Sequence, residues 1–274
     1  MNNAFDEPTV VWHTPDTTDR PLVVLLHGRG ADETGIIGLA GHLPAGPSYA
    51  AVRAPIPAGG GYAWFANRGI GRPVAESLNQ TMAWFRKWLD NVAPPGRQVI
   101  LVGFSGGAAF AGGLLLSDPQ RFAGAAILNG TLPFDAGVPT SPARLAGVPV
   151  FVAQGETDTV IPRELLDRTW TYLLGDSGAP SYARRDPGLA ATASPMTLLR
   201  SLAAGSRSVC TSSPPAALCR PTMAPGTPFP TARSRFVPAL APMFPGRYRR
   251  SSAPTIARAT SGSGSWTVSS PCPG

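Results

Sequence analysis

The chain has 274 residues, of which 43% are hydrophobic, enough for one large α/β domain or two small ones. Its formal charge of +7 is unevenly spread, because residues 1–186 hold 14 Lys and Arg against 16 Asp and Glu, whereas residues 187–274 hold 9 arginines and no acid. No apolar run approaches the roughly 18 residues of a membrane span, and Cys210, Cys219 and Cys272 lack zinc-ligand spacing. We therefore expect no membrane span, no metal site and no cofactor.

The first residues lack the features of a secretory signal peptide. Residues 1–6 carry no positive charge, and the apolar run at residues 21–27 is too short for a signal-peptide core. The sequence therefore predicts a cytoplasmic protein.

Residues 1–187 alternate short apolar runs with amphipathic stretches, which is typical of a mostly parallel sheet with helices on both faces. The apolar runs predict strands at residues 22–26, 49–54, 99–102, 123–128, 148–153 and 182–185. Helical spacing, small residues or an initial proline predict helices at residues 34–43, 74–92, 107–116 and 163–174. A loop rich in proline and glycine joins two of these elements at residues 54–67. We expect one α/β domain over residues 1–187.

Residues 188–274 have a different composition, rich in Arg, Pro, Ser and Ala, and only residues 196–204 resemble a helix. A basic segment of this kind can be an arm that binds nucleic acid or a membrane surface. Such arms usually cluster their charges and also use lysine, whereas here only Arg249 and Arg250 are adjacent and lysine is absent. We therefore expect an irregular, solvated tail and no nucleic-acid partner.

Residues 103–107 read Gly-Phe-Ser-Gly-Gly, between the predicted strand and the predicted helix. A bare G-x-S-x-G pattern occurs by chance in so glycine-rich a chain, but a strand-to-helix turn is where a nucleophile elbow lies. The turn exposes the serine Oγ, and the glycines relieve clashes with the strained backbone. The pattern predicts Ser105 as the nucleophile of a serine hydrolase, with the backbone N–H of Gly106 as an oxyanion donor.

A second oxyanion donor is expected after the first predicted strand. That strand ends at His27-Gly28, and in hydrolases with this elbow an early strand-end loop supplies the second N–H. The backbone N–H of Arg29 is the candidate, and the alternative is a glycine-rich turn without a catalytic role.

An acid follows the predicted strand at residues 148–153, in the sequence Gln-Gly-Glu-Thr-Asp. A carboxylate in such a loop can accept a hydrogen bond from an imidazole and hold the ring in the required tautomer. Asp158 is the better candidate, and Glu156 is the alternative.

The expected histidine is missing. A serine hydroxyl needs a base to take its proton, and in hydrolases with this elbow the order along the chain is serine, acid, histidine. The three histidines, His13, His27 and His42, all precede Ser105. His27 is expected to be a structural residue beneath the site.

Five segments in this order resemble the phospholipase/carboxylesterase family of small α/β-hydrolases, which includes acyl-protein thioesterases: LLHGRGADE, APIPAGGGYAWF, LVGFSGGA, LNGTLP and PVFVAQGETDTVIP. The resemblance covers about residues 20–187 and implies an α/β-hydrolase fold. It implies a small-molecule ester or acyl thioester as the substrate. By the same resemblance, Trp64 and Phe65 would line the acyl-side entrance, although core packing explains them almost as well. The roles that it implies in catalysis are Ser105 as nucleophile, Asp158 as acid, and the backbones of Arg29 and Gly106 as oxyanion donors.

The family's next motif is Gly-His followed by an aliphatic residue, and this chain has Ala-Ala-Thr-Ala-Ser at residues 190–194. Those residues can be encoded by GCG GCC ACG GCA TCN, which reads GGC CAC GGC ATC from its third base. The shifted reading encodes Gly-His-Gly-Ile. A tail without acids and rich in Arg, Pro, Ala and Ser is also what a GC-rich gene yields out of frame. We therefore interpret the sequence after about Gly188 as the product of a frameshift or of a sequencing error.

These observations predict a serine carboxylesterase or thioesterase that is impaired because its triad histidine is absent. Oxyanion stabilisation and substrate binding alone can retain about 1,000-fold catalysis over water after loss of a triad member. The alternative is a non-catalytic protein of the same fold that binds acyl groups or esters.

Overall fold

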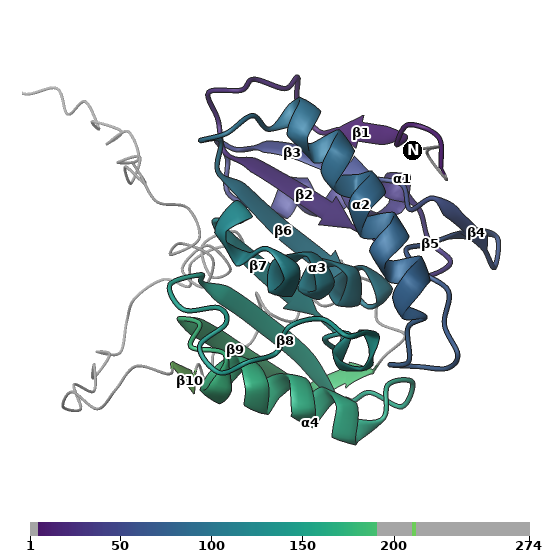
Figure 1. Ribbon diagram of the computed structural model, residues 1–274, viewed down its shortest axis with the longest axis vertical. Coiled ribbons are helices and arrows are strands. Elements are labelled where there is room, and N and C mark those ends of the chain that lie inside the picture. Colours follow the sequence, from purple (N-terminus) through teal and green to yellow (C-terminus); the bar gives the residue numbers. More distant parts are fainter. Residues whose placement is uncertain (1–4, 191–209, 212–274) are drawn as a thin grey trace, which may run out of the picture.

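The computed structural model describes residues 5–190 and 210–211. An eight-stranded sheet, in the order β1-β3-β2-β6-β7-β8-β9-β10, forms its centre (Figure 1). The strands from β3 to β9 in that order run parallel, and β1 and β10 pair antiparallel at the two edges. The bounds are β1 Val10–Trp12, β2 Leu22–Leu26, β3 Ser48–Val52, β6 Val99–Phe104, β7 Gly124–Leu128, β8 Val150–Thr157, β9 Ser181–Ala190 and β10 Cys210–Thr211.

Helices cover both faces of the sheet, as the alternating sequence predicts (Figure 1). Helices α2 (Ala75–Val92), α3 (Gly106–Ser117) and α4 (Arg163–Thr171) lie in front of the sheet in this view, and α1 (Glu33–Ile36) lies behind it with a 3₁₀ turn, η1 (Ile37–His42). Side chains alternate along each strand between the two faces. Each face of the sheet accordingly has its own hydrophobic core. The core in front of the sheet contains Leu101 and Ile127, whereas the core behind it contains Ile100 and Ala126.

The burial pattern explains why the central strands read as continuous apolar runs. Every residue of β2, β3 and β7 is buried, because each of these strands has neighbours on both sides and helices over its faces. Helix α3 is buried along most of its length, so its sequence is apolar all round rather than amphipathic.

The structure differs from the sequence-based expectations at several places. The predicted loop at residues 54–67 contains a short antiparallel hairpin of β4 (Ile56–Ala58) and β5 (Gly61–Ala63). Its second strand is held by the loop after β2, because the Tyr62 N–H donates to the Ala31 carbonyl over 2.9 Å. The predicted helix at residues 163–174 ends at Thr171 and continues as a π-helical turn, η4 (Tyr172–Asp176).

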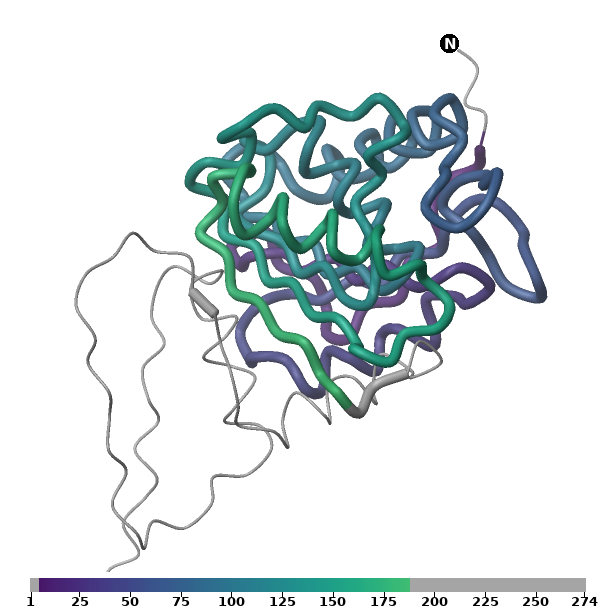
Figure 2. Tube along the Cα trace, turned by 90° about the horizontal axis from the view of Figure 1, so that it is seen from below, coloured from purple at the N-terminus to yellow at the C-terminus, as the bar shows by residue number. Residues whose placement is uncertain are grey.

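The last parallel strand is longer than predicted. Strand β9 begins at Ser181 and continues to Ala190, past the domain boundary expected at residue 187, and β10 pairs with it through Cys210 and Thr211. The view from below in Figure 2 brings the green segment with α4 and β9 to the front. The helix expected at residues 196–204 and the rest of the expected tail lie outside the described residues.

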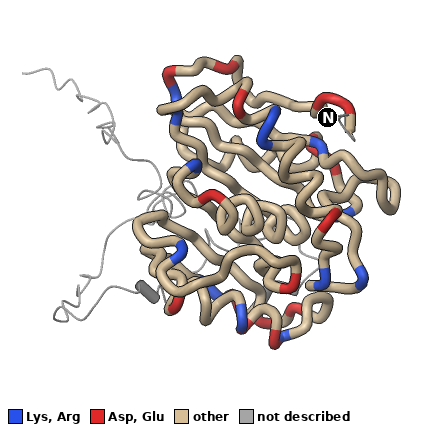
Figure 3. Tube along the Cα trace, in the orientation of Figure 1, with Lys and Arg blue, Asp and Glu red and all other residues tan. Residues whose placement is uncertain are grey.

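Charged residues of the described chain are interspersed over its surface. Acidic and basic positions are intermingled along the trace in Figure 3. Among the described residues, no helix is long and apolar enough to cross a membrane.

Candidate active site

Ser105 lies in the tight turn between β6 and α3, in a backbone conformation that few non-glycine residues adopt. Its φ is 51° and its ψ is −115°, and it is the N-cap residue of α3. Its N–H donates to the Leu128 carbonyl over 2.9 Å, so the turn is fixed to the neighbouring strand β7. Strain of this kind persists only where the surroundings enforce it, and it is typical of functional sites.

The two glycines of the pattern are required by close backbone packing. A Cβ built on Gly103 would lie 2.3 Å from the carbonyl oxygen of Gly107, and a Cβ on Gly107 would lie 2.2 Å from the carbonyl oxygen of Leu26. No side chain fits at those distances, so the G-x-S-x-G spacing follows from the elbow geometry.

The backbones of Arg29 and Gly106 lie together beside Ser105. A Cβ built on Gly106 would be 3.3 Å from the backbone nitrogen of Arg29. Gly106 is the first residue of α3, so its N–H has no acceptor within the helix and lies at the positive end of the helix dipole. The Arg29 guanidinium donates to the Phe65 carbonyl over 3.1 Å, which fixes the loop. This pair matches the expected oxyanion donors in position, and the catalytic role of the two N–H groups stays a prediction.

Asp158 directly follows β8 and is held by the backbone of the next loop. Its Oδ1 accepts hydrogen bonds from the N–H groups of Val160 and Ile161, each over 2.9 Å. The carboxylate is half-buried, so part of it stays available to a further donor. The role of Asp158 as triad acid stays a prediction, and the alternative, Glu156, is exposed.

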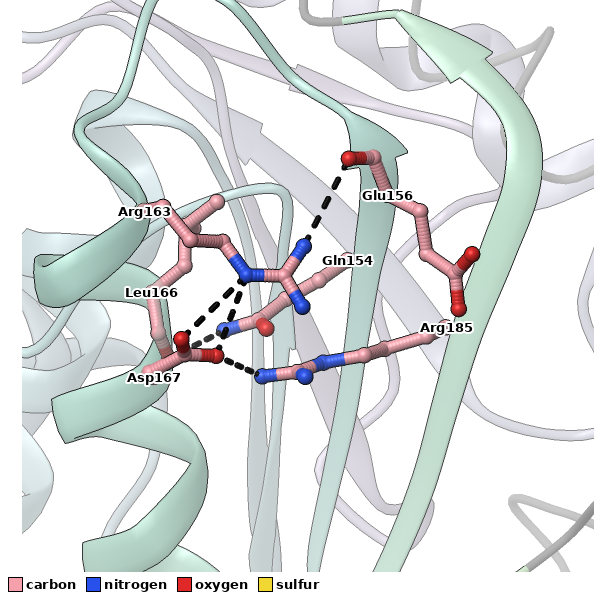
Figure 4. A network of polar contacts seen from close by, with 6 residues as sticks. All are labelled: Gln154, Glu156, Arg163, Leu166, Asp167 and Arg185. Atoms are coloured by element: carbon pink, nitrogen blue, oxygen red, sulfur yellow. Dashed lines mark hydrogen bonds and ion pairs between the residues drawn. The ribbon is translucent and has the colours of Figure 1, made fainter.

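A polar network fixes the end of β8 and the loop that carries Asp158 to α4 and β9 (Figure 4). Arg163 donates to an Asp167 carboxylate oxygen over 3.2 Å and to the Glu156 carbonyl over 3.5 Å. Arg185, from β9, also donates to Asp167, and its guanidinium lies 4.4 Å from the centre of the Trp170 ring. Opposing charges and hydrogen bonds lower the pKa of Asp167 against the opposing effect of burial, which is the largest single influence on it.

Ser105 and Asp158 both lie at the carboxyl edge of the sheet, with one strand between them. Strand β6 pairs in parallel with β7, and β7 pairs in parallel with β8. In open α/β sheets the ligand site lies at this edge. The topology therefore brings the predicted nucleophile and the predicted acid to one edge, on either side of the end of β7.

The three histidines are not at this position. His27 is 1% exposed, and its Nε2 accepts a hydrogen bond from the Ala54 N–H over 3.0 Å. Its Nδ1 must therefore carry the proton and donate to the Gly28 carbonyl, over 2.7 Å. Burial, the largest influence, lowers the pKa of His27 and keeps the ring neutral. His13 and His42 are exposed. Both precede β3 in the sequence, towards its amino end and thus towards the opposite edge of the sheet.

Trp64 and Phe65 are packed in the front core. Trp64 is 1% exposed, stacks on Phe110 with 4.4 Å between ring centres, and donates its indole N–H to the His27 carbonyl over 2.8 Å. Phe65 is 5% exposed. These contacts describe core packing, and the part expected of both residues at the acyl-side entrance stays a prediction.

The sequence reasoning missed Asn129, which follows β7 between the two predicted catalytic residues. It is 2% exposed, has φ of 41°, and donates its N–H to the Ala153 carbonyl over 2.8 Å. In the described part of the chain, neither Nδ2 nor Oδ1 of its side chain has a hydrogen-bond partner. An Asn-Gly pair directly after an apolar strand was the available signal, since asparagine tolerates the left-handed region and Gly130 has no room for a Cβ.

Comparisons with known proteins agree with this geometry. The chain matches the phospholipase/carboxylesterase family model over residues 8–177. The carboxylesterase of Bacillus cereus has a similar structure, with a TM-score of 0.60 and 22% sequence identity over 70% of this chain and 90% of that chain. A carboxylesterase from Mesorhizobium loti gives a TM-score of 0.57 and 27% identity over 65% and 85% of the two chains.

Acyl-protein thioesterase 2 from Zea mays has the same fold, with a TM-score of 0.56 and 21% identity over 69% of this chain and 94% of its own. The search of curated proteins gave no match. The family model covers more than half of the chain, and the sheet order and elbow fit the same fold. The chain belongs to the phospholipase/carboxylesterase family of α/β-hydrolases.

Proposed function

We propose that this chain is a serine esterase that hydrolyses carboxylic esters or acyl thioesters through an acyl-enzyme on Ser105. The observation that carries the proposal is the strained conformation of Ser105 between β6 and α3, with the Arg29 and Gly106 backbones beside it. Family membership supports ester hydrolysis in general and a small-molecule ester as substrate.

The proposed reaction has two steps. The Ser105 Oγ attacks the carbonyl carbon, the Oγ proton passes to a base, and the bond to the leaving alcohol or thiol breaks as that group takes a proton. Water then attacks the acyl-enzyme and releases the acid. The N–H groups of Gly106 and Arg29 would stabilise the oxyanion in both steps, each worth about 3 kcal/mol where such donors have been removed. Asp158 would orient the imidazole that serves as the base.

This chain lacks that imidazole among its described residues, so we propose that its activity is impaired. His27 cannot serve, because Ala54 occupies its Nε2 and Gly28 accepts the proton on its Nδ1. A non-catalytic protein that binds esters or acyl groups is the second candidate, and the missing base is the observation that favours it.

The course of β9 supports the frameshift interpretation. Ala190, the last residue of β9, pairs with Thr157, the residue before Asp158. In the shifted reading of the codons for residues 190–194, the histidine codon overlaps codons 191 and 192. A histidine encoded there would directly follow the strand end that lies beside the predicted acid. Resequencing the gene across codons 186–196 tests this interpretation, and a confirmed frame as printed would contradict the sequencing-error form of it.

Hydrolysis of p-nitrophenyl butyrate tests the function itself. The unaltered chain is expected to release p-nitrophenolate slowly but above the buffer rate, and Ser105→Ala is expected to remove the difference. Equal rates in the two proteins would contradict a serine mechanism. Equal rates together with saturable binding of the ester would instead support the binding protein.

A further inference from the structure

We propose that the Asn129 side chain is a recognition group for a hydroxyl carried by the substrate close to its scissile carbonyl. The inference rests on the proposed function, because it concerns the same site. It makes Asn129 a specificity-determining residue between the nucleophile and the acid.

The first argument is the position of Asn129. Its N–H donates to the Ala153 carbonyl, and the residue before it, Leu128, accepts the hydrogen bond from the Ser105 N–H. A Cβ built on the next residue, Gly130, would lie 2.7 Å from the Ser105 carbonyl oxygen. Asn129 is therefore attached to the nucleophile turn on one side and to β8 on the other.

The second argument is that the side chain is buried without a partner. A buried amide that forms no hydrogen bond costs free energy, and nearly all buried polar groups in native proteins are paired. Asn129 is 2% exposed, and within the described residues both its donor and its acceptor are unpaired. A hydrogen-bonding group of the substrate would remove this cost.

The backbone conformation does not explain the choice of asparagine. Asparagine tolerates the positive φ of 41°, but glycine adopts it without strain and would bury no amide. The carboxamide is thus present at a cost that the turn itself does not require.

Gln154, on the neighbouring strand β8, adds another unpaired acceptor. It restricts which functional groups of a ligand could bind there. Leu128 pairs with Ala153, so Asn129 directly follows β7 at the level where Gln154 follows Ala153 in β8. Gln154 is 2% exposed and donates from Nε2 to the Leu166 carbonyl over 2.9 Å, whereas its Oε1 is unpaired among the described residues.

A hydroxyl is a small group that satisfies this set. It accepts from the Asn129 Nδ2 and donates to one of the two oxygens at the same time. A carboxylate could not donate to either oxygen, and an ammonium group could not accept from the Nδ2. An ordered water has the same chemistry as a hydroxyl and is the alternative source that the experiment must separate.

The experiment measures acylation of Ser105 in the full chain by mass spectrometry. The probes are phenyl butyrate, phenyl 2-hydroxybutyrate and phenyl 3-hydroxybutyrate. Each hydroxy ester is compared with phenyl butyrate. In each reaction the bond from Ser105 Oγ to the acyl carbon forms, the bond to phenolate breaks, and the Oγ proton passes to solvent. Each rate is divided by the rate at which hydroxide hydrolyses the same ester, which removes intrinsic reactivity.

In the unaltered chain, at least one hydroxy ester is expected to acylate Ser105 about tenfold faster than phenyl butyrate after this correction, the scale of one hydrogen bond to a buried group. Asn129→Leu, of similar size but apolar, and Asn129→Gly, with a relaxed backbone, are both expected to lower that ratio to about one. Ala143→Gly is the matched control, because Ala143 has φ of 58° on a different loop and the ratio should not change.

The outcomes are distinct. A ratio near one in the unaltered chain, or a ratio that survives in both Asn129 variants, would overturn the inference and leave an ordered water as the occupant. Loss of the ratio in Asn129→Leu alone would also overturn it, because the apolar side chain rather than the missing amide would be the cause. Absence of any acylation at Ser105 in the unaltered chain would contradict the proposed function, and the inference would fail with it.

Discussion

The two edges of the sheet use polar groups in opposite ways. At the amino edge, Arg97 is almost fully buried, and its guanidinium pairs with the Asp16 carboxylate over 2.6 Å and donates to the carbonyls of Arg20, Thr17 and Val92. At the carboxyl edge, Ser105 has a strained backbone and the Asn129 side chain has no partner among the described residues. Hydrogen bonds satisfy the buried Arg97 guanidinium at the first edge, whereas at the second a strained residue and an unpaired amide lie next to each other in the fold.

The largest expected effect comes from restoring the missing histidine at the carboxyl edge of the sheet. Restoring the reading frame so that Gly-His-Gly-Ile follows β9 is expected to raise kcat for p-nitrophenyl butyrate by about 1,000-fold or more, because general-base activation of the serine is what the chain lacks. KM should change less, since all the proposed substrate-binding residues lie within residues 5–190. Steady-state kinetics on both proteins measure the change.

Its control is Ser105→Ala in the restored protein, which is expected to lose the gain. If the unaltered chain already matched the restored rate, another group would have to act as the base, and the proposed impairment would be contradicted.

At the amino edge, Arg97→Met is expected to lower the free energy of unfolding by about 3 kcal/mol. The substitution leaves Asp16 and three carbonyls without their donor, and removal of one partner of a buried pair costs this much. Urea denaturation measures the loss, with the exposed Lys87→Met as a matched control within about 0.5 kcal/mol of the parent. The rate at which a fluorophosphonate labels Ser105 in the folded variant should be unchanged, and a large fall in that rate would show that the two edges are not independent.

Strain at the nucleophile predicts a smaller effect of opposite sign. Ser105→Gly is expected to be more stable than Ser105→Ala by about 1 kcal/mol, because glycine adopts φ of 51° without a steric penalty. Both variants lack the hydroxyl, so thermal or urea unfolding isolates the backbone contribution. Equal stabilities would mean that the elbow is not strained.

The last expected effect is a pH dependence from the single titrating group of His27. Burial lowers its pKa below the ordinary 6.5, so the unfolded chain binds a proton more readily than the folded chain. The contribution of His27 to stability is therefore complete above pH 6.5 and is lost as the pH falls from there towards the folded pKa. The unfolding free energy of the parent should fall faster between pH 6.5 and 5 than that of His27→Gln, by at most about 1.4 kcal/mol per pH unit. If the unfolding free energies of the two proteins changed with pH in parallel, the neutral, buried state of His27 would be contradicted.

The sequence predicts the centre of the fold better than its margins. Strands β2 and β6 are continuous apolar runs because both faces are covered, and the elbow glycines are fixed by backbone contacts at 2.2 and 2.3 Å. The β4–β5 hairpin was missed because its strands have only three residues each and β4 contains Pro57, a residue that is unfavourable in a strand. The length of β9 was missed because Pro187, inside the strand, reads as a strand end.

The positions of the candidate site residues could also be predicted in part, and their catalytic roles stay predictions. Ser105 and Asp158 follow apolar strands and have local patterns, and the structural role of His27 was anticipated from its place in the chain. The unpaired state of Asn129 depends on what surrounds it in three dimensions, so composition and spacing carry no sign of it.

The most direct test of the central claim is peptide mapping after fluorophosphonate treatment of the unaltered chain, the restored protein and Ser105→Ala. We expect one phosphonylated residue, Ser105, labelled slowly in the unaltered chain and rapidly in the restored protein, and no label at the site in Ser105→Ala. A label on another residue in the restored protein, or the same labelling in Ser105→Ala, would contradict it.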